Sequence, residues 1–402
     1  MGFSYFLIDK ESVANVIKVL CTFVAMNKKM AIRKNIPLIV LSVSLLLYLL
    51  AICCPSFFST FYTQGVYKYV SQAGSHFFAL IPFSFAELMI VLLPVCIGYF
   101  LVKGAYLILF QRTKALLFWK RLVINISKLI CYILSAFILF AGVNYQRVPI
   151  ATSMGLEIAP ASKDDLKELC FFLRDKTNEL SFLTGRTKEG KFLPVHSFWE
   201  AKEKIAQAYD SLSIIYPAFR GSYPSAKPLL FSHYLSYAHV MGFFFPFTFE
   251  SNINKDIPEF FIPAVIAHEQ AHLRGFMRED EAEFSLFLLC RHTSDIDLMY
   301  SFILSLFIRS ISVLYKIDSD AYSLLLEGLS APLLRDLYDN STYWRAFQSP
   351  VGAISKSVND AYLKANSQSD GVQSYGRVVD LLIADYKRNQ INKKQLYENQ
   401  CP

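Results

Sequence analysis

Charge is scarce in this sequence. Charged residues make up only 18% of the 402 residues, whereas hydrophobic residues make up 53%. A soluble chain of this length rarely has such a composition, so membrane-spanning segments are expected. The formal net charge of +7 lies largely beside apolar runs rather than in a basic stripe interleaved with aromatic residues. Nucleic acid is therefore not an expected partner.

Paired cysteines are also lacking. The sequence has no Cys-x-x-Cys pair, which argues against a thiolate zinc site or a redox motif. Four of its eight cysteines lie in apolar runs and are interpreted as small hydrophobic residues: Cys53, Cys54, Cys96 and Cys131. A disulfide between Cys170 and Cys290 would leave Cys401 unpaired, and the sequence does not decide whether it forms. Phosphate-cradling loops, serine elbows and nucleophilic-cysteine signatures are absent as well.

Three long apolar runs predict membrane-spanning helices at residues 36–54, 86–110 and 122–145. Each is close to or above the length of about 20 residues that a helix needs to cross the hydrocarbon core. Together they define a predicted three-helix membrane region, residues 36–145, behind a basic N-terminal segment, residues 1–35. The lipid bilayer is therefore an expected partner.

The loops between these runs differ in charge. The N-terminal segment and the loop between the second and third runs are basic, whereas residues 55–85 contain a single Lys or Arg residue, Lys68. Because positively charged loops stay in the cytoplasm, we expect a cytoplasmic N-terminus and an extracytoplasmic chain after Tyr145. The basic residues that carry this prediction are Lys18, Lys28, Lys29, Arg33, Lys34, Arg112, Lys114, Lys120 and Arg121.

Two further segments allow more than one interpretation. Residues 55–85 are rich in Phe and Tyr, which favours an external loop on the membrane surface, but an ordinary packed loop fits equally well. Residues 299–315 are apolar enough for a fourth span. We prefer a buried core helix, because the run is short and Arg309 would cost about 2.5–3.5 kcal/mol at mid-membrane.

The composition becomes less apolar after residue 145. Helical spacing of apolar residues predicts helices at 163–183, 197–216, 260–274, 279–290 and 297–316. We therefore predict an extracytoplasmic domain at residues 146–385, mostly helical with little strand, followed by a polar tail at residues 386–402.

The segment His268-Glu269-Gln270-Ala271-His272 carries the strongest chemical signal. Two histidines four residues apart on a helix share a face and can hold one zinc ion. Glu269 then reaches a water at that zinc and serves as general base, which is the logic of His-Glu-x-x-His peptidases. The preceding residues 260–267 are apolar, so this helix is expected to be buried, and buried polar groups need a reason to be there.

A third zinc ligand is expected just beyond Gly275, which is predicted to end the helix. Residues 278–284 read Arg-Glu-Asp-Glu-Ala-Glu-Phe. Acidic residues in a first helical turn also stabilise the helix dipole, which accounts for some of them without a metal. Glu279 is the preferred ligand and Glu281 the second choice, while Glu283 can orient a ligand histidine from behind.

Other candidates have weaker support. His233 and His239 do not share a helical face, so a metal role is not expected. Glu250 and Asn252 precede the zinc helix and would contact substrate if an edge strand there held an extended peptide, although a plain loop fits as well. Tyr375 and Arg377 are candidate donors to a tetrahedral oxyanion.

Several stretches together resemble an uncharacterised bacterial membrane family catalogued as domain of unknown function 3810. The resemblance rests on residues 81–84 (IPFS), 144–145 (NY), 245–254 (FPFTFESNIN), 268–276 (HEQAHLRGF), 278–282 (REDEA) and 374–380 (SYGRVVD). It implies a multi-pass protein of the bacterial plasma membrane with a zinc-peptidase domain. The Glu-x-Glu-Ala stretch is similar to the third-ligand motif of other His-Glu-x-x-His peptidases, which favours Glu279. Family members tend to have Asn in place of Glu283.

The sequence thus predicts a mainly α protein with three N-terminal transmembrane helices and a zincin-like extracytoplasmic domain. Its expected activity is that of a zinc metallopeptidase: His268, His272 and Glu279 would hold Zn²⁺, and Glu269 would act as base on a peptide or protein substrate. The alternative is a non-catalytic membrane sensor or assembly factor with a structural or vestigial metal site. A fourth protein ligand would favour that alternative, and an open coordination position would favour the enzyme.

Overall fold

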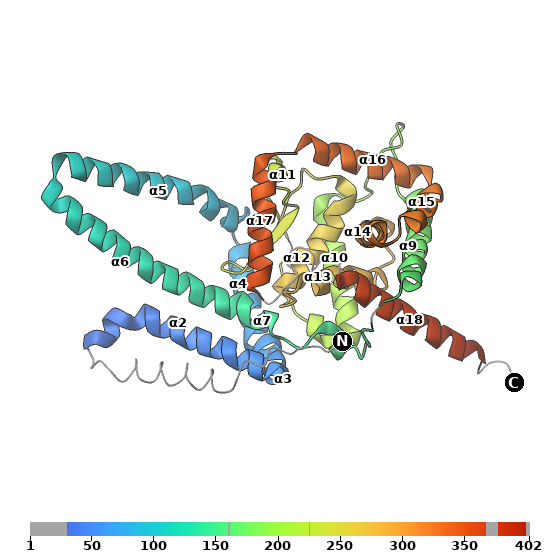
Figure 1. Ribbon diagram of the computed structural model, residues 1–402, viewed down its shortest axis with the longest axis horizontal. Helices are drawn as coiled ribbons and strands as arrows, with labels where there is room; N and C mark the ends of the chain where they lie inside the picture. The colour runs from blue at the N-terminus through green and yellow to red at the C-terminus, as the bar shows by residue number, and fades with distance from the viewer. Residues whose placement is uncertain (1–29, 160, 225, 367–376, 399–402) are drawn as a thin grey trace. The chain divides into compact units, whose positions relative to one another are not determined.

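The computed structural model describes residues 30–159, 161–224, 226–366 and 377–398 (Figure 1). The described chain is mostly helical with little strand, which confirms the predicted mainly α class. It divides into two compact units. Unit 1 comprises Met1–Gly65 and Leu88–Arg147, and unit 2 comprises Val66–Glu87 and Val148–Pro402.

Unit 1 contains the long apolar helices. They are α2 (Met30–Cys53), α5 (Phe85–Phe110, whose first turn lies in unit 2) and α6 (Arg112–Phe137), with the shorter α3 (Pro55–Phe58), η2 (Ile138–Gly142) and α7 (Val143–Tyr145). The stretches Asn35–Cys53, Phe85–Phe110 and Arg112–Tyr145 are long and apolar enough to cross a membrane, and only 17%, 11% and 6% of their most apolar windows is buried within the protein. Apolar side chains that face away from the protein are typical of helices in lipid. The chain therefore has the features of a membrane protein.

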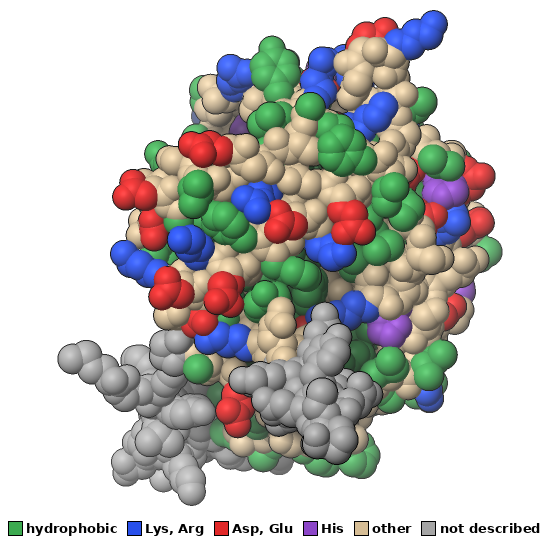
Figure 2. All heavy atoms as spheres, turned by 90° about the vertical axis from the view of Figure 1, so that its right-hand side faces the viewer, with side chains coloured by type: hydrophobic (Ala, Val, Ile, Leu, Met, Phe, Trp, Pro, Cys, Tyr) green, Lys and Arg blue, Asp and Glu red, His purple; other side chains and the backbone are tan. Residues whose placement is uncertain are grey.

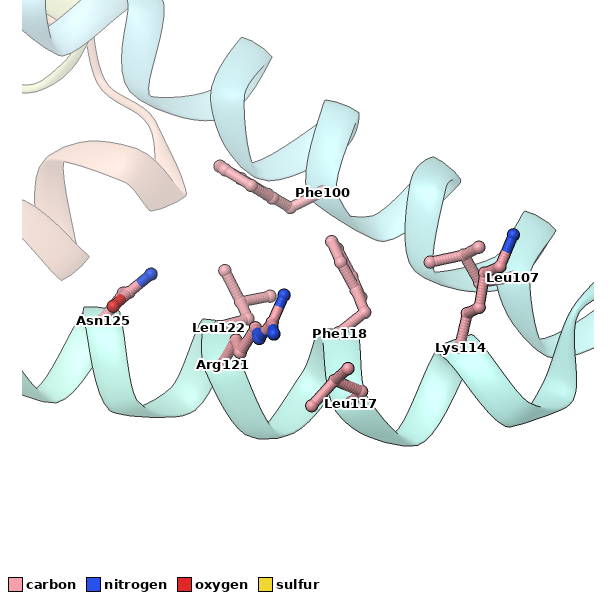
Figure 3. A pocket seen from close by; sticks show the side chains of 8 residues that line it. All are labelled: Phe100, Leu107, Lys114, Leu117, Phe118, Arg121, Leu122 and Asn125. Carbon is pink, nitrogen blue, oxygen red and sulfur yellow. The ribbon is translucent and has the colours of Figure 1, made fainter.

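A groove separates α5 from α6 (Figure 3). Phe100 and Leu107 line it from α5, and the remaining lining residues, Lys114, Leu117, Phe118, Arg121, Leu122 and Asn125, belong to α6. The rings of Phe100 and Phe118 lie 6.5 Å apart across it. The groove is thus an apolar space between two candidate spans, with Lys114, Arg121 and Asn125 as its polar groups.

Residues 55–85 are not a loop. They form α3, the π-helix η1 (Ser59–Tyr67) and α4 (Lys68–Ala79). Residues 66–87 fold with unit 2, so the predicted domain boundaries at 145 and 146 miss this part of the second unit. Tyr67 is buried, and its hydroxyl donates to the carbonyl oxygens of His272 and Leu273.

Unit 2 is a helical assembly around one apolar core. Two of its helices, α9 and α10, begin at reciprocal capping boxes, which Ser162 forms with Asp165 and Ser197 forms with Glu200. Besides α4, its described helices are α8 (Ile150–Ser153), α9 (Lys163–Leu183), α10 (Phe198–Ile215), η3 (Pro217–Phe219), α11 (Ser232–Tyr237), η4 (Glu259–Phe261), α12 (Ile262–Leu273), α13 (Glu279–Cys290), α14 (Ile296–Ile317), α15 (Ser319–Glu327), α16 (Ala331–Ala346), α17 (Pro350–Ala365) and α18 (Arg377–Glu398). The five predicted helices are confirmed to within two residues at each end.

A small sheet lies beside α12 in unit 2. Its described strands are β1 (Lys227–Pro228), β2 (Gly242–Phe245) and β3 (Glu250–Ile253), in the order β1-β3-β2. β3 pairs in parallel with β1 and antiparallel with β2, where Phe243 is opposite Asn252. Glu250 and Asn252 therefore lie on the central strand, and β1 and β2 are the two edge strands of the described sheet.

Helix α14 meets the length and hydropathy of a span, but 61% of its most apolar window is buried in protein. This burial agrees with the preferred interpretation as a core helix. Residues 386–398, predicted as part of a polar tail, continue helix α18 instead. Cys170 and Cys290, whose pairing the sequence left open, are free thiols.

Candidate metal centre

Local sequence sets the start and the end of α12. Pro263 occupies its first turn, where the missing N–H costs nothing. At the other end Gly275 has a φ of +89°, a conformation that side chains with a Cβ rarely adopt. The Gly275 N–H donates to the carbonyl of His272, and the Phe276 N–H donates to that of Ala271. These two bonds form a Schellman motif, which turns the chain back toward the helix it has just left.

Helix α13 begins four residues after Gly275, at Glu279, and brings its first turn to α12. The structure places the Glu279 carboxylate beside both histidines of α12. His268 Nε2 lies 3.0 Å from Glu279 Oε2, and His272 Nε2 lies 3.7 Å from the same oxygen. The two histidine Nε2 atoms are 3.1 Å apart. Within the described part of the chain, these three side chains are the group that could hold a metal ion.

The outer nitrogen of each imidazole faces an oxygen atom, and among the described residues that of His272 forms a hydrogen bond whereas that of His268 does not. His272 Nδ1 donates to the carbonyl oxygen of Phe276 at 2.7 Å, so the Schellman turn orients that ring. His268 Nδ1 lies 3.2 Å from Glu283 Oε2. Glu283 in turn accepts a hydrogen bond from Ser305 of α14 and lies 3.7 Å from Arg309 Nε. Such partners fix the tautomer of a metal-binding histidine.

The tautomers implied by these partners provide a test of whether the residues suit a metal. With the proton of each ring on Nδ1, both Nε2 atoms carry lone pairs directed toward each other and toward the Glu279 carboxylate. Three electron-rich atoms at 3.0–3.7 Å repel one another unless a proton or a metal cation lies among them. Zinc takes nitrogen and oxygen ligands at about 2.0–2.2 Å in a tetrahedral arrangement, which gives similar ligand-to-ligand spacings. The donor set therefore fits Zn²⁺.

Glu269 lies beside the cluster without joining it. The residue is 5% exposed, and its Oε2 has no hydrogen-bond partner among the described residues. A buried, unsatisfied carboxylate oxygen is costly and calls for a ligand or water. Burial also raises the pKa of Glu269 above its ordinary value.

Strand β2 approaches α12 closely at Glu269. A Cβ atom at Gly242 would lie 2.7 Å from Val265 Cγ1 and 3.1 Å from Glu269 Cγ. Only glycine allows this approach without displacement, so Gly242 sets the spacing between the edge strand β2 and the helix that carries the histidines.

The electrostatics of the cluster follow from burial and close pairing. Burial disfavours a charge on Glu279, but the adjacent His272 and His268 hold the pKa of that carboxyl well below its usual range. Burial also disfavours a charge on Glu283, but His268 and Arg309 lower the pKa of its carboxyl to about 2. Burial opposes a positive charge on His268, yet its contacts with Glu279 and Glu283 raise its pKa above the ordinary value. The site therefore keeps two ionised carboxylates beside groups that can carry positive charge.

The structure places other predicted site residues away from the cluster. Glu281 accepts a hydrogen bond from the Ile150 backbone N–H. Asn252 accepts one from Ser84, and Arg377 lies 3.7 Å from the Asp280 carboxylate. Tyr375 lies outside the described residues.

Glu250 has a structural partner set rather than a substrate-facing position. Its carboxylate accepts hydrogen bonds from the Phe85 and Ala86 backbone N–H groups at the start of α5, and it pairs with Lys227 at 2.6 Å. The two histidines from which no metal role was expected also have other partners. His233 pairs with Asp256, and the His239 ring stacks on Trp344.

Four residues near the site were not singled out from the sequence. They are Phe276, Ser305, Gly242 and Tyr67. A local signal existed for Phe276 alone. A glycine at the end of a helix predicts a turn in which the carbonyl of the following residue is directed toward the last turn of the helix. The other three reach the site through tertiary packing between segments that are distant in sequence.

These observations define a helical membrane protein whose second unit holds a buried His-His-Glu cluster. The chain belongs to a family described as a protein of unknown function, DUF3810, whose profile matches residues 62–383. The match begins at residue 62, near the start of the segment that completes unit 2. Comparison with curated proteins and with solved structures gave no match.

Proposed function

We propose that this protein is a membrane-anchored zinc metallopeptidase with a zincin-like domain in unit 2. The observation that carries the proposal is the meeting of His268 Nε2, His272 Nε2 and a Glu279 oxygen at 3.0–3.7 Å, beside a buried glutamate oxygen without a partner. Three protein ligands leave a coordination position for water or substrate, as in catalytic zinc sites. A structural site would instead be closed by a fourth protein ligand.

The residues have separable roles in this proposal. His268, His272 and Glu279 hold the ion, and the Phe276 carbonyl and Glu283 keep the two rings in the tautomer that binds it. Zinc, when bound, supplies a Lewis acid that lowers the pKa of water and polarises a peptide carbonyl. Glu269 accepts a proton at Oε2 from the attacking water and delivers it to the leaving amine.

The outer edge of strand β2 offers a place for the substrate backbone. β2 pairs with β3 on one side only, and it passes beside Glu269 at Gly242. An extended peptide can pair with such an edge through backbone hydrogen bonds, which is selective for polypeptide rather than for a small molecule. Glu250 and Asn252, on the central strand, are not part of this surface.

The arrangement in the membrane is also part of the proposal. The three apolar stretches of unit 1 would cross the bilayer, with the basic N-terminal segment and the basic beginning of α6 in the cytoplasm. Unit 2, with its metal centre, would then lie on the extracytoplasmic side of a bacterial plasma membrane.

The replacement Glu269→Gln tests the activity. It removes the proton acceptor but keeps the size of the side chain, so we expect zinc to remain and hydrolysis to fall by about 10²- to 10⁴-fold. Newly formed peptide N-termini can be compared by mass spectrometry between cells that produce the wild-type protein and cells that produce the variant.

The matched control is Glu259→Gln, the same chemical change at an exposed residue shortly before α12. Cleavages that depend on the enzyme should persist in the control and disappear in Glu269→Gln. Identical sets of N-termini in all three cell lines would rule out hydrolysis by this site.

A further inference from the structure

Helix α17 has an apolar face that the described protein does not cover. Val351, Ile354 and Val358 recur at helical spacing and are 54%, 64% and 63% exposed. Ala361, Tyr362 and Ala365 extend the same stripe and are exposed too. A stripe of this kind in a soluble domain normally marks a binding surface.

The remaining faces of α17 show which way the stripe points. Gly352 and Leu363 are buried and mark the flank that packs on unit 2. Lys356 and the ion-paired Asp360 and Lys364 lie on the side opposite to the stripe. The helix thus has one flank on protein, one polar face, and an apolar face directed away from both, as in helices that lie in a membrane surface.

A second group of exposed apolar residues continues this surface. Leu230, Phe231 and Tyr234, at and before α11, are 70%, 47% and 70% exposed. The hydroxyl of Ser349, the N-cap of α17, donates to the carbonyl of Tyr237 in α11 at 2.8 Å. Figure 1 shows these two helices next to each other in unit 2. Tyrosine beside apolar residues is typical of the membrane–water interface.

The start of helix α5 fixes the level of this surface relative to a membrane. Glu87, in the first turn of α5, accepts hydrogen bonds from the backbone N–H groups of Leu230 and Phe231 at 2.9 and 2.7 Å. Because α5 is a candidate span that begins at Phe85, its first turn lies where the hydrocarbon core begins. Leu230 and Phe231 are held at that same depth.

Another face of unit 2 has a different composition. Figure 2 shows the side that carries α9 and α15, where Lys, Arg, Asp and Glu side chains of both signs are scattered between apolar ones. Such mixed charge is typical of a surface in water. In α17 no charged residue lies between Val351 and Ser355. The charged residues further along the helix, Lys356, Asp360 and Lys364, lie on the face opposite to the apolar stripe.

We infer that α17 and the segment Leu230–Tyr237 form a membrane-docking surface, through which unit 2 lies on the bilayer that α5 enters. The occupant of this surface is lipid: the interfacial zone of the same leaflet, reached by Leu230, Phe231, Tyr234, Val351, Ile354 and Val358. This inference does not depend on the proposed peptidase activity. It requires only that α5 crosses the membrane.

Nitroxide labels on α17 test the inference in the full-length protein. Labels can be attached through a genetically encoded ketone amino acid at Ile354, Val358 and, as the matched control, Ser357, which is exposed on the same helix but off the apolar stripe. The protein is reconstituted in nanodiscs of phosphatidylethanolamine and phosphatidylglycerol. Oxygen, which partitions into lipid, and a water-soluble nickel chelate then report the surroundings of each label.

We expect labels at Ile354 and Val358 to be more accessible to oxygen than to the nickel chelate, and the label at Ser357 to show the reverse. Equal chelate accessibility at all three positions would mean that α17 lies in water. Immobilised labels at Ile354 and Val358 that neither reagent reaches would mean that a protein, such as a second copy of this chain, covers the stripe. Either result would overturn the assignment to lipid.

A charge on the stripe gives an independent check. Ile354→Glu should lift the helix from the interface and raise the chelate accessibility of a label at Val358, whereas Ser357→Glu should leave it unchanged. All of these positions are exposed, so neither change is expected to disturb the fold of unit 2.

Discussion

Helices α5 and α14 are both long and apolar, but they differ in how much of each is buried within the protein. Both are at least 22 residues long and apolar enough to cross a membrane. Yet 11% of the most apolar window of α5 is buried within the protein, against 61% for α14. Hydropathy records only that a helix avoids water. It does not distinguish lipid from the interior of a protein as the place that receives it.

The contacts of the few polar residues in each helix distinguish the protein interior from lipid. In α14, Ser305 donates to Glu283 and Arg309 lies 3.7 Å from it, so the helix presents polar groups to the carboxylate that faces His268. In α5, Lys103 has local contacts with Tyr99, one turn earlier on the same helix. α14 is therefore a core helix that supports the candidate metal centre, and α5 is a helix suited to lipid.

Truncating a matched leucine in each helix should give the largest difference. Leu306 in α14 is fully buried, whereas Leu101 in α5 is 58% exposed from the protein. We expect Leu306→Ala to lower the free energy of unfolding of unit 2 by about 2–5 kcal/mol, because it leaves a cavity. Leu101→Ala should change it by less than about 0.5 kcal/mol, since it removes no packing in unit 2. Denaturant unfolding in mild detergent measures both, and equal effects would break the comparison.

Replacing Glu283 of α13, which contacts the His268 ring, should have an intermediate effect, measured as a change in zinc affinity. Glu283→Gln weakens the carboxylate contact with His268 Nδ1, so we expect zinc affinity to fall by about 10- to 100-fold. Chelator competition on the purified protein measures this fall. Glu281→Gln, two residues earlier on the same helix, is the control and should keep the wild-type affinity. A loss of zinc in Glu281→Gln but not in Glu283→Gln would instead favour Glu281 as the third ligand.

Replacing the arginine of α14 should have the smallest effect. The Arg309 side chain is 41% exposed and pairs with Glu283. An ion pair that is this exposed contributes up to about 1 kcal/mol to the free energy of unfolding. Arg309→Leu should therefore lower the unfolding free energy by less than about 1 kcal/mol. If α14 were in lipid, removing the arginine would stabilise it by about 2.5–3.5 kcal/mol. A gain of that size in thermal unfolding experiments in nanodiscs would place α14 in the membrane.

The sequence was most informative where the interactions are local. The helix at 163–183 was predicted with the bounds that the structure gives it, because a capping box and a regular apolar face lie within the segment itself. The end of α12 at Gly275 was predicted for the same reason. The structure brings Glu279 to the two histidines across a turn of only a few residues, which spacing alone could suggest.

The predictions that failed concern contacts between distant segments. Residues 66–87 were assigned to the membrane region because aromatic composition does not show that Tyr67 would pack under α12. For Glu250 and Asn252 the sequence left an edge strand and a plain loop open, whereas β3 is the central strand of the described sheet because β1 also pairs with it. Strand order depends on pairing partners far apart in the chain, and a single strand's sequence does not specify it.

The zinc content of the purified full-length protein tests the central claim most directly. Elemental analysis should find about one zinc per chain in the wild type and in Glu269→Gln, and almost none in His272→Ala. His272→Ala removes a ligand, whereas Glu269→Gln removes only the proposed base. Zinc that persists at the wild-type level in His272→Ala, or that is absent from the wild type, would contradict the assignment of this cluster as a zinc site.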